Sequence, residues 1–447
     1  MGLDVTRTVP APRDAVFAWH SRPGALTRLA PPWLPMRPIV EASSLADGQA
    51  ILSLPARMRW VAQHDPDYFE PGHQFSDYCA SSPLKQLTRW RHTHTFTDAS
   101  PGHTLVHDHV QTRIPGRFLD ATFRYRHRQL VDDLADHEWA RHYQPKPLTV
   151  AMTGSSGMVG TALRAFLTTG GHRVIRLVRG TAQSEDERTW NPDAPDLELL
   201  RGVDGVVHLA GASIAGRFTG EHKAKIRSSR IGPTGLLAQV AADTASVRTF
   251  VCASAIGFYG ADCGDSLLDE SSPRGTGFLA DTVYDWESDT DPATMGGVRV
   301  VNVRTGIVQS TQGGVLQLQR PLFEIGAGGR LGSGKQWLSW IDINDLVGIY
   351  HRALIDTELV GPVNAVAPDA VRNSDYTRVL ASVLRRPAVI PVPPLGPRLL
   401  LGKEGARELA LASQRVVPAK LDGRGHQFRF PDLEECLRHQ TGRLLTG

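Results

Sequence analysis

Three glycines stand at the spacing that a phosphate-binding loop requires. Residues 148–152 form a short apolar run, and Gly154, Gly157 and Gly160 follow it. In such a loop the first glycine permits a tight turn, the second lets the backbone approach a pyrophosphate, and the third allows the next helix to pack closely. The N-terminus of that helix favours phosphate charge. We expect the contacts to come from Gly154, Ser155, Ser156, Gly157, Met158, Val159 and Gly160.

The elements around this loop follow the order strand, helix, strand. The apolar run 148–152 predicts the first strand, residues 161–169 predict a helix, and residues 173–178 predict the second strand. A glycine pattern by itself is a weak signal, and this βαβ context makes it specific. The segment therefore predicts an α/β Rossmann-type fold, with a doubly wound parallel sheet, that binds a dinucleotide.

The end of the second strand bears on which dinucleotide binds. NAD sites usually place Asp or Glu near this position, where it accepts hydrogen bonds from the ribose hydroxyls. Here the strand ends with Val178 and Arg179. A guanidinium can pair with the 2′-phosphate of NADP, so Arg179 favours NADP(H) as the cofactor. The alternative is an ordinary surface arginine after a strand.

A third strand signal covers residues 205–208. The small residues Ala210 and Gly211 follow it and would let the cofactor lie over the end of the strand, so we place Leu209, Ala210 and Gly211 with the cofactor. His208 is a catalytic candidate at first sight. Its place in an apolar run favours a packed core histidine instead.

Later segments resemble those of the bacterial epimerase family proteins, an atypical group of the extended short-chain dehydrogenase/reductase superfamily. The segments are 254–260, 277–280, 286–287, 304–306, 339–342 and 361–368. Three more, 386–387, 417–421 and 428–431, resemble the small C-terminal domain of that group. The resemblance implies an NADP-linked oxidoreductase, epimerase or dehydratase acting on a small-molecule substrate. It also adds Arg304 to the cofactor-binding residues.

The chain departs from the superfamily at the expected proton-transfer site. The usual mechanism needs a Tyr-x-x-x-Lys pair and a serine or threonine that positions the substrate oxygen. Aligned on Tyr259, the usual serine position falls on Ala255, with Ser254 one residue earlier. The tyrosine and lysine positions fall near Leu279 and Val283. Whether the protein is an enzyme therefore stays open at this point.

Three residues are candidate substitutes in catalysis. Ser254 could reach the nicotinamide side. Tyr284 could act as an acid, although Ser288 stands where a lysine would follow it, and the alternative is an amphipathic surface tyrosine. Arg230 occupies the place of the family's asparagine at a helix start, where a fixed guanidinium could stabilise an oxyanion or hold a substrate carboxylate.

The first part of the chain has a different pattern. Residues 3–9 predict a strand, residues 13–20 and 25–30 predict short helices, several strand signals follow, and residues 121–143 predict a long helix. This order, with the segment 16–20, resembles the α+β helix-grip fold of the polyketide-cyclase/START-like superfamily. There a curved sheet wraps the last helix, so the resemblance implies a site for an apolar ligand.

Domain boundaries follow from these patterns. The stretch 144–147 contains two prolines that disfavour a continuing helix, which predicts a linker. We expect a START-like helix-grip domain at 1–145, an NADP-binding Rossmann domain at 148–380, and a small C-terminal domain packed on the Rossmann domain at 381–447.

Composition limits the other possibilities. The chain has 447 residues, 41% of them hydrophobic and 21% charged, with a net charge of +3 and no basic run, which argues against nucleic acid as a partner. Four scattered cysteines fit a reducing compartment. No signal peptide and no apolar stretch of about 18 residues is evident, so we expect a cytoplasmic protein without a membrane partner. The sequence leaves the oligomeric state open.

Two functions remain in competition. The first is an NADP(H)-dependent enzyme with a non-standard active site. The second is a non-catalytic module that senses NADP(H) and binds a hydrophobic ligand. The missing Tyr-x-x-x-Lys pair favours the second function, whereas the glycine loop does not discriminate between them.

Overall fold

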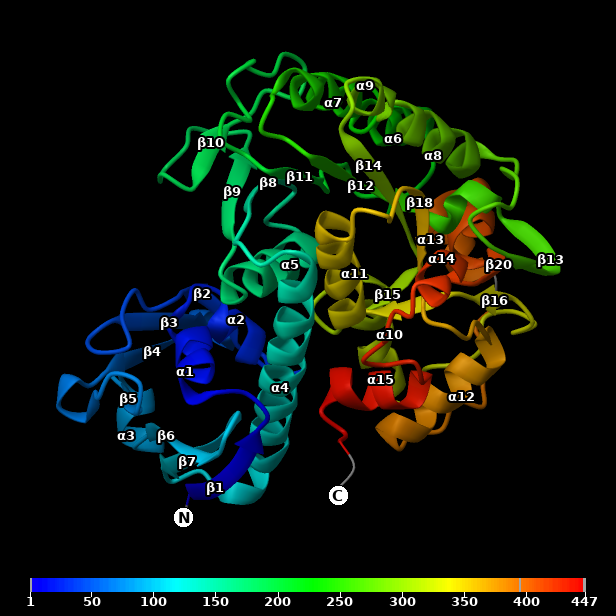
Figure 1. The fold of residues 1–447 in the computed structure, drawn as a ribbon. Helices are drawn as coiled ribbons and strands as arrows, with labels where there is room; N and C mark the ends of the chain where they lie inside the picture. The colour runs from blue at the N-terminus through cyan, green and yellow to red at the C-terminus, as the bar shows by residue number, and fades with distance from the viewer. Residues whose placement is uncertain (1, 394, 445–447) are drawn as a thin grey trace. The chain divides into compact units, whose positions relative to one another are not determined.

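The computed structural model describes residues 2–393 and 395–444, which form two compact units (Figure 1). The first unit comprises Met1–Pro147, Arg164–His172 and His439–Gly447, and the second comprises Leu148–Leu163 and Arg173–Arg438. Within the described residues, no helix is both long enough and apolar enough to cross a membrane.

An antiparallel sheet of seven strands forms the body of the first unit. Its order is β1 (Gly2–Val9), β7 (His103–Gln111), β6 (Arg91–Ser100), β5 (Gln74–Cys79), β4 (Arg59–His64), β3 (Gln49–Ser53) and β2 (Arg37–Val40). The helices are α1 (Arg13–Ser21), α2 (Ala25–Leu29), α3 (Leu84–Thr88) and the long α4 (Asp120–Tyr143). This is the order of elements that the sequence predicts for the first part of the chain.

One face of this sheet is buried and the other faces solvent. Along β6, His92, His94 and Phe96 are buried and alternate with half-buried threonines, because successive side chains of a strand point to opposite faces. The buried face packs against α1 and α4, with Trp19 and Leu130 in the shared core. The outer face of β7 therefore presents its polar side chains to solvent.

A parallel sheet of seven strands organises the second unit. Its order is β10 (Glu187–Thr189), β9 (Arg173–Val178), β8 (Thr149–Thr153), β11 (Gly205–His208), β12 (Thr249–Ala255), β14 (Arg299–Thr305) and β18 (Gly361–Ala365). The chain starts at β8, runs outward to β10, and returns to continue at β11. This doubly wound order confirms the predicted Rossmann-type fold and places the topological switch point between β8 and β11.

Helices cover both faces of the parallel sheet, so most residues of its central strands are buried. One face carries α6 (Gly220–Ser228), α7 (Pro233–Asp243), α8 (Phe278–Ser288) and α9 (Asp291–Met295), and α11 (Ile343–Ile355) lies on the other (Figure 1). Helix α5 (Met158–Thr169) begins three residues earlier than the sequence predicts, directly after Gly157.

The C-terminal part of the second unit adds a small second sheet. Strand β20 (Ser413–Val416) pairs in parallel with β13 (Asp262–Leu268). The helices of this C-terminal segment are α12 (Asn373–Leu384), α13 (Leu395–Gly405), α14 (Ala419–Gly423) and α15 (Leu433–Thr441). Leu433 and Leu437 of α15 share a core with Tyr376 and Leu380 of α12.

Candidate active site

The glycine loop connects β8 to α5 at the switch point of the parallel sheet. Gly154 has a φ of 64°, and a Cβ on it would lie 2.8 Å from the carbonyl carbon of Leu209. A Cβ on Gly160 would overlap the carbonyl oxygen of Gly154. Both glycines are therefore required by the packing of the loop itself. The missing side chain of Gly160 thus makes room for the loop backbone. Its spacing in the sequence had suggested close packing of the helix against a strand instead.

Gly157 serves a different purpose. A Cβ on this residue would meet only the carbonyl oxygen of Gly154, at 3.3 Å, and no other atom within 4 Å. The turn is closed by hydrogen bonds from Gly157 N to Gly154 O (3.0 Å) and from Thr161 N to Gly157 O (2.8 Å). The first amides of α5 have no acceptor inside the helix. With no side chain on Gly157, the loop backbone can approach a pyrophosphate at these amides, so the loop fits a dinucleotide.

Two arginines stand at or after the end of β9. Arg179 follows the strand, is exposed, and makes no ion pair with a described residue. Arg176, which the sequence analysis passed over, pairs with Glu187 of β10 (2.8 Å), and its Nε lies 3.4 Å from Ser155 Oγ. Arg176 is thus held beside the glycine loop, whereas Arg179 is available to a ligand.

His208 is a core residue, as predicted. Its Nδ1 lies 2.9 Å from Thr153 Oγ1 and its Nε2 lies 3.1 Å from Thr234 Oγ1. Burial lowers the pKa of His208 to about 4, so the imidazole is neutral. Thr153 Oγ1 also accepts hydrogen bonds from the amides of Leu209 and Ala210. This network fixes the chain where it leaves β11, at the predicted place of the cofactor.

Arg230 lies beside the end of β11. Its guanidinium donates to the carbonyl oxygens of Ala212 (3.0 Å) and Ile226 (3.1 Å) and stacks over the Trp286 ring at 5.0 Å. A Cβ on Gly211 would lie 2.9 Å from Arg230 Cζ, which explains the glycine at that position. Burial lowers the pKa of Arg230 to about 10, so the side chain stays charged at neutral pH.

Three polar residues stand side by side at the carboxyl end of the sheet. The strand register pairs Ser254 of β12 with Arg304 of β14, and Arg304 with Asn364 of β18. All three are buried. Residues in register on parallel strands point to the same face of the sheet. This row lies at the edge where open α/β sheets bind their ligands.

Glu287 of α8 joins two members of this row. Ser254 Oγ donates to Glu287 Oε1 at 2.5 Å. Arg304 donates to both carboxylate oxygens, from Nε at 2.8 Å and from Nη2 at 2.7 Å. Burial opposes the charge on Arg304, but the contacts with Glu287 outweigh it, and the pKa of Arg304 rises. Glu287 therefore links a serine hydroxyl to a bidentate ion pair, the strongest kind of side-chain contact.

Tyr259 extends the network away from Ser254. Arg304 Nη1 donates to Tyr259 Oη at 3.2 Å, and the hydroxyl donates to Asn364 Oδ1 at 2.7 Å. The Phe258 ring centroid lies 3.5 Å from the Arg304 guanidinium. Burial raises the pKa of Tyr259, although Arg304 opposes the shift, so the phenol keeps its proton. The buried network thus runs from Ser254 through Glu287 and Arg304 to Tyr259.

Two predicted site residues make contacts that were not expected from the sequence. Tyr284 is 48% exposed, and its ring lies under the Arg274 guanidinium at 4.7 Å. The structure does not bring it to Ser254, which favours the surface alternative. Arg304, which the sequence placed with the cofactor, is buried, and its guanidinium binds Glu287. Contact with the cofactor stays a prediction for this residue.

A residue far along the chain contacts the start of α8, the helix that carries Glu287. Glu408, just after α13, accepts hydrogen bonds from the amides of Phe278 (3.2 Å) and Leu279 (2.8 Å) at the start of α8. An acidic side chain at this end of a helix is favourable. Glu287, Tyr259, Asn364 and Glu408 are not among the site residues predicted from the sequence. Glu287 and Tyr259 lie in family-like segments, but no local pattern marks Glu408.

Comparisons with known proteins agree with this geometry. The model of the NAD dependent epimerase/dehydratase family matches residues 150–283, and a domain of unknown function, DUF1731, matches residues 392–440. An epimerase family protein of Mycobacterium bovis is 42% identical over 297 residues, which are 66% of this chain and 98% of that protein.

Two solved structures are also similar. One, from Corynebacterium glutamicum and described as a nucleoside-diphosphate sugar epimerase, is 44% identical with a TM-score of 0.87, over 98% of this chain and 90% of that one. The human epimerase family protein SDR39U1, solved with NADPH, is 29% identical with a TM-score of 0.61, over 66% of this chain and 100% of that one. On these similarities the chain belongs to the epimerase family, the group of proteins related to NAD-dependent epimerases and dehydratases.

Proposed function

We propose that the second unit binds NADP(H) and uses it in an oxidoreductase or epimerase reaction on a small-molecule substrate. One observation carries the proposal. The glycine loop after β8 and the Ser254–Glu287 pair beside β12 stand at the same carboxyl edge of one parallel sheet, with only β11 between the two strands. A cofactor and a reacting group at that edge are the usual arrangement of such folds.

The residues present fit the cofactor. The amides at the start of α5 would hold the pyrophosphate, and the exposed Arg179 would pair with a 2′-phosphate. Ala210 and Gly211 would leave room for the nicotinamide half over the end of β11. The NADPH bound to the human relative supports this choice of nucleotide. When bound, NADP(H) would supply or accept a hydride.

The Ser254–Glu287 pair would take the place of the missing tyrosine and lysine. A substrate hydroxyl bound beside Ser254 can pass its proton to the serine oxygen as Ser254 gives its own hydrogen to Glu287. The carboxylate is held in place by two hydrogen bonds from Arg304, which fix the direction of its oxygens. Arg230, with its fixed guanidinium at the end of β11, would bind a negatively charged part of the substrate.

Sugar nucleotides are the first substrate class to test, because the Corynebacterium glutamicum relative is described as acting on them. For the first unit we propose a helix-grip domain, on the support of its element order. Its inner face carries the buried His92 and His94 and the partly buried Asp108, so a ligand there would meet polar groups as well as apolar ones.

Deuterium transfer would test the reaction. The protein is incubated with NADPH deuterated at C4 and with keto forms of sugar nucleotides, whose carbonyl carbon can accept the deuteride, and products are analysed by mass spectrometry. We expect transfer by the wild type and by Ser288→Ala, an exposed serine of α8, and a large loss in Ser254→Ala and Glu287→Gln. NADPH binding without transfer to any substrate would indicate a sensing module. A failure to bind NADPH would contradict the whole proposal.

A further inference from the structure

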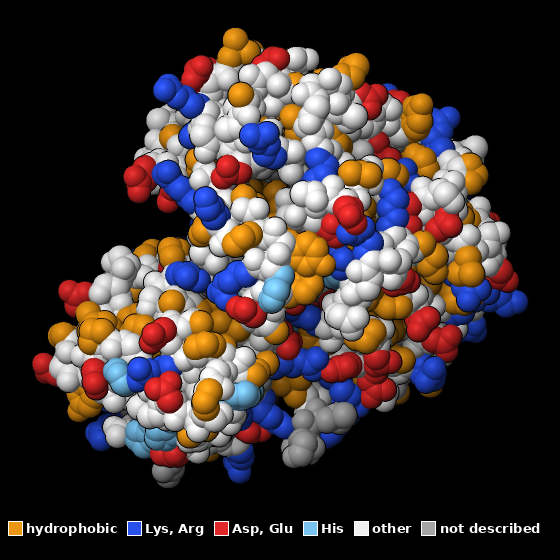
Figure 2. Space-filling model, in the orientation of Figure 1, with side chains coloured by type: hydrophobic (Ala, Val, Ile, Leu, Met, Phe, Trp, Pro, Cys, Tyr) orange, Lys and Arg blue, Asp and Glu red, His pale blue; other side chains and the backbone are white. Residues whose placement is uncertain are grey.

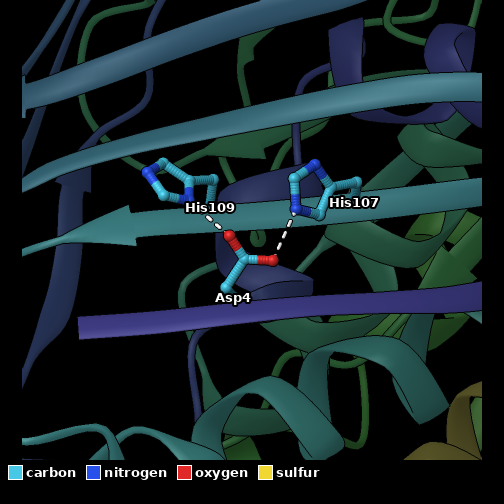
Figure 3. A group of neighbouring side chains, drawn as sticks. All are labelled: Asp4, His107 and His109. Carbon is cyan, nitrogen blue, oxygen red and sulfur yellow. Dashed lines mark hydrogen bonds and ion pairs between the residues drawn. The ribbon is translucent and has the colours of Figure 1, made fainter. Parts of the chain in front are cut away.

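A second group of polar residues, unrelated to the parallel sheet, stands on the first unit. Histidine side chains gather at the surface of this unit (Figure 2). His107 and His109 are two residues apart on β7 and therefore point to the same, outer face of the sheet. Asp4 of the edge strand β1 is the register partner of His109 (Figure 3).

The three side chains converge on one point. Asp4 Oδ1 lies 2.9 Å from His107 Nε2, and Asp4 Oδ2 lies 2.7 Å from His109 Nδ1. One potential ligand atom from each residue lies within 4.8 Å of the other two. The carboxylate thus stands between two imidazoles, with both of its oxygens engaged (Figure 3).

The surroundings of this group suit a divalent cation. At the register positions beside the two histidines, the neighbouring strands carry Thr6, Thr93 and Thr95, none of which is charged. The side chains of His107, His109 and Asp4 are 38%, 41% and 65% exposed, so a metal ion could enter and keep water ligands.

His109 also has an orienting partner behind it. Its other ring nitrogen, Nε2, lies 3.2 Å from the side-chain amide of Gln111. With Nδ1 bound to a metal, Nε2 would carry the proton and donate it to the amide oxygen of Gln111 after a flip of that amide. Partners of this kind fix the tautomer and the ring orientation of metal-binding histidines.

A comparable group on the buried face of the same sheet is a poorer metal site. Asp77, His92 and His94 also lie close together there. Asp108 contacts His92 Nε2 and His94 Nδ1, each at 3.0 Å, so its carboxylate is already engaged. Burial lowers the pKa of Arg126 on α4, and the charges of Asp108 and Asp77 oppose that shift. The positive charge of the Arg126 guanidinium therefore already lies near these two carboxylates.

We propose that Asp4, His107 and His109 form a Zn²⁺ site that ties the edge strand β1 to β7. Two imidazoles, one carboxylate and a water molecule are a common ligand set for zinc. Zinc–ligand bonds of about 2.0–2.2 Å place tetrahedral ligand atoms about 3.4 Å apart. The contacts of Asp4 with His107 (2.9 Å) and His109 (2.7 Å) would need to open by less than about 1 Å to reach this spacing. Zinc would bind the folded strands and not the unfolded chain. It would therefore stabilise the first unit.

Zinc titration of the untagged, full-length protein tests the proposal. After removal of metal with a chelator, Zn²⁺ binding is measured by calorimetry and the Tm is recorded with and without Zn²⁺. We expect one zinc ion per chain and a rise in Tm. Asp4→Asn, His107→Ala and His109→Ala should each weaken binding by about tenfold or more and abolish the rise in Tm. His103→Ala, an exposed histidine of the same strand, is the matched control and should change neither.

Two results would overturn the proposal. In the first, zinc affinity is unchanged in the double variant His107→Ala/His109→Ala. In the second, zinc binding is lost only when His92 and His94 are replaced, which would place the metal on the buried face. Circular dichroism without zinc shows whether each variant folds. If an alanine variant does not fold, His107→Gln and His109→Gln, which keep a polar side chain at these exposed positions, replace it in the same titration.

Discussion

Ser254 Oγ donates a hydrogen bond of 2.5 Å to Glu287 Oε1, across the boundary between strand β12 and helix α8. The resemblance places the superfamily's tyrosine and lysine positions near Leu279 and Val283, and we propose that the Ser254–Glu287 pair acts in their place. Arg304 holds the carboxylate from its other side. Single substitutions in this network and in the cofactor loop can therefore test the functional proposal.

Loss of Arg179 should change cofactor preference. In Arg179→Ala the 2′-phosphate would lose a charge-assisted partner, worth about 1.5–3 kcal/mol, so the affinity for NADPH should fall about tenfold or more while the affinity for NADH stays constant. Calorimetric titration of both nucleotides measures this. Arg173→Ala, at the opposite end of β9, is the control and should bind both as the wild type does. Equal weakening of both nucleotides would rule out a 2′-phosphate contact.

The glycines of the loop should separate into two kinds. Because a Cβ on Gly157 would meet only one backbone atom, the carbonyl oxygen of Gly154 at 3.3 Å, Gly157→Val should lower the Tm by only a few degrees while weakening NADPH binding about tenfold or more. Gly160→Val should lower the Tm by much more, because its Cβ would overlap the loop backbone. Thermal unfolding and NADPH titration of both variants check this. A large fall in Tm for Gly157→Val would show that this glycine also serves packing.

Breaking the buried ion pair should destabilise the second unit. Arg304→Met leaves the Glu287 carboxylate without its bidentate partner in a site where both side chains are almost inaccessible. Removal of one partner of a buried pair typically costs about 3–5 kcal/mol. Urea unfolding followed by tryptophan fluorescence measures the loss. Arg274→Ala, which removes an exposed stacking contact with Tyr284 and an exposed ion pair with Asp281, should cost less than about 1 kcal/mol.

The neutral core histidine should make the protein sensitive to acid. Burial lowers the pKa of His208 to about 4, against about 6.5 in an unfolded chain. Between these pH values the unfolded state therefore binds more protons than the folded state. The contribution of neutral His208 to the free energy of unfolding is complete above pH 6.5 and is lost as the pH falls towards 4. At pH 5 the loss from His208 is about 2 kcal/mol. Comparing urea unfolding at pH 7.5 and pH 5 in the wild type and His208→Gln measures it, and an unchanged pH dependence in the variant would contradict the assignment.

Much of the second unit could be predicted from the sequence. The glycine spacing, the apolar runs and the helix between them are features of neighbouring residues, so they are present in the sequence before any long-range contact forms. The core role of His208 follows from the same local pattern. The element order of the first unit could likewise be read from alternating and helical spacing.

The reacting groups depend on contacts between distant parts of the chain. Tyr284 and Glu287 lie one turn apart on α8, and only the packing of that helix decides that Glu287 meets Ser254 while Tyr284 faces solvent. Likewise, the antiparallel register of β1 and β7 brings Asp4 to His109.

The sequence by itself determined the cofactor loop and the order of the elements, because short-range spacing encodes them. The tertiary structure decided which polar side chains meet, because strand register and helix rotation are set by burial across the whole unit.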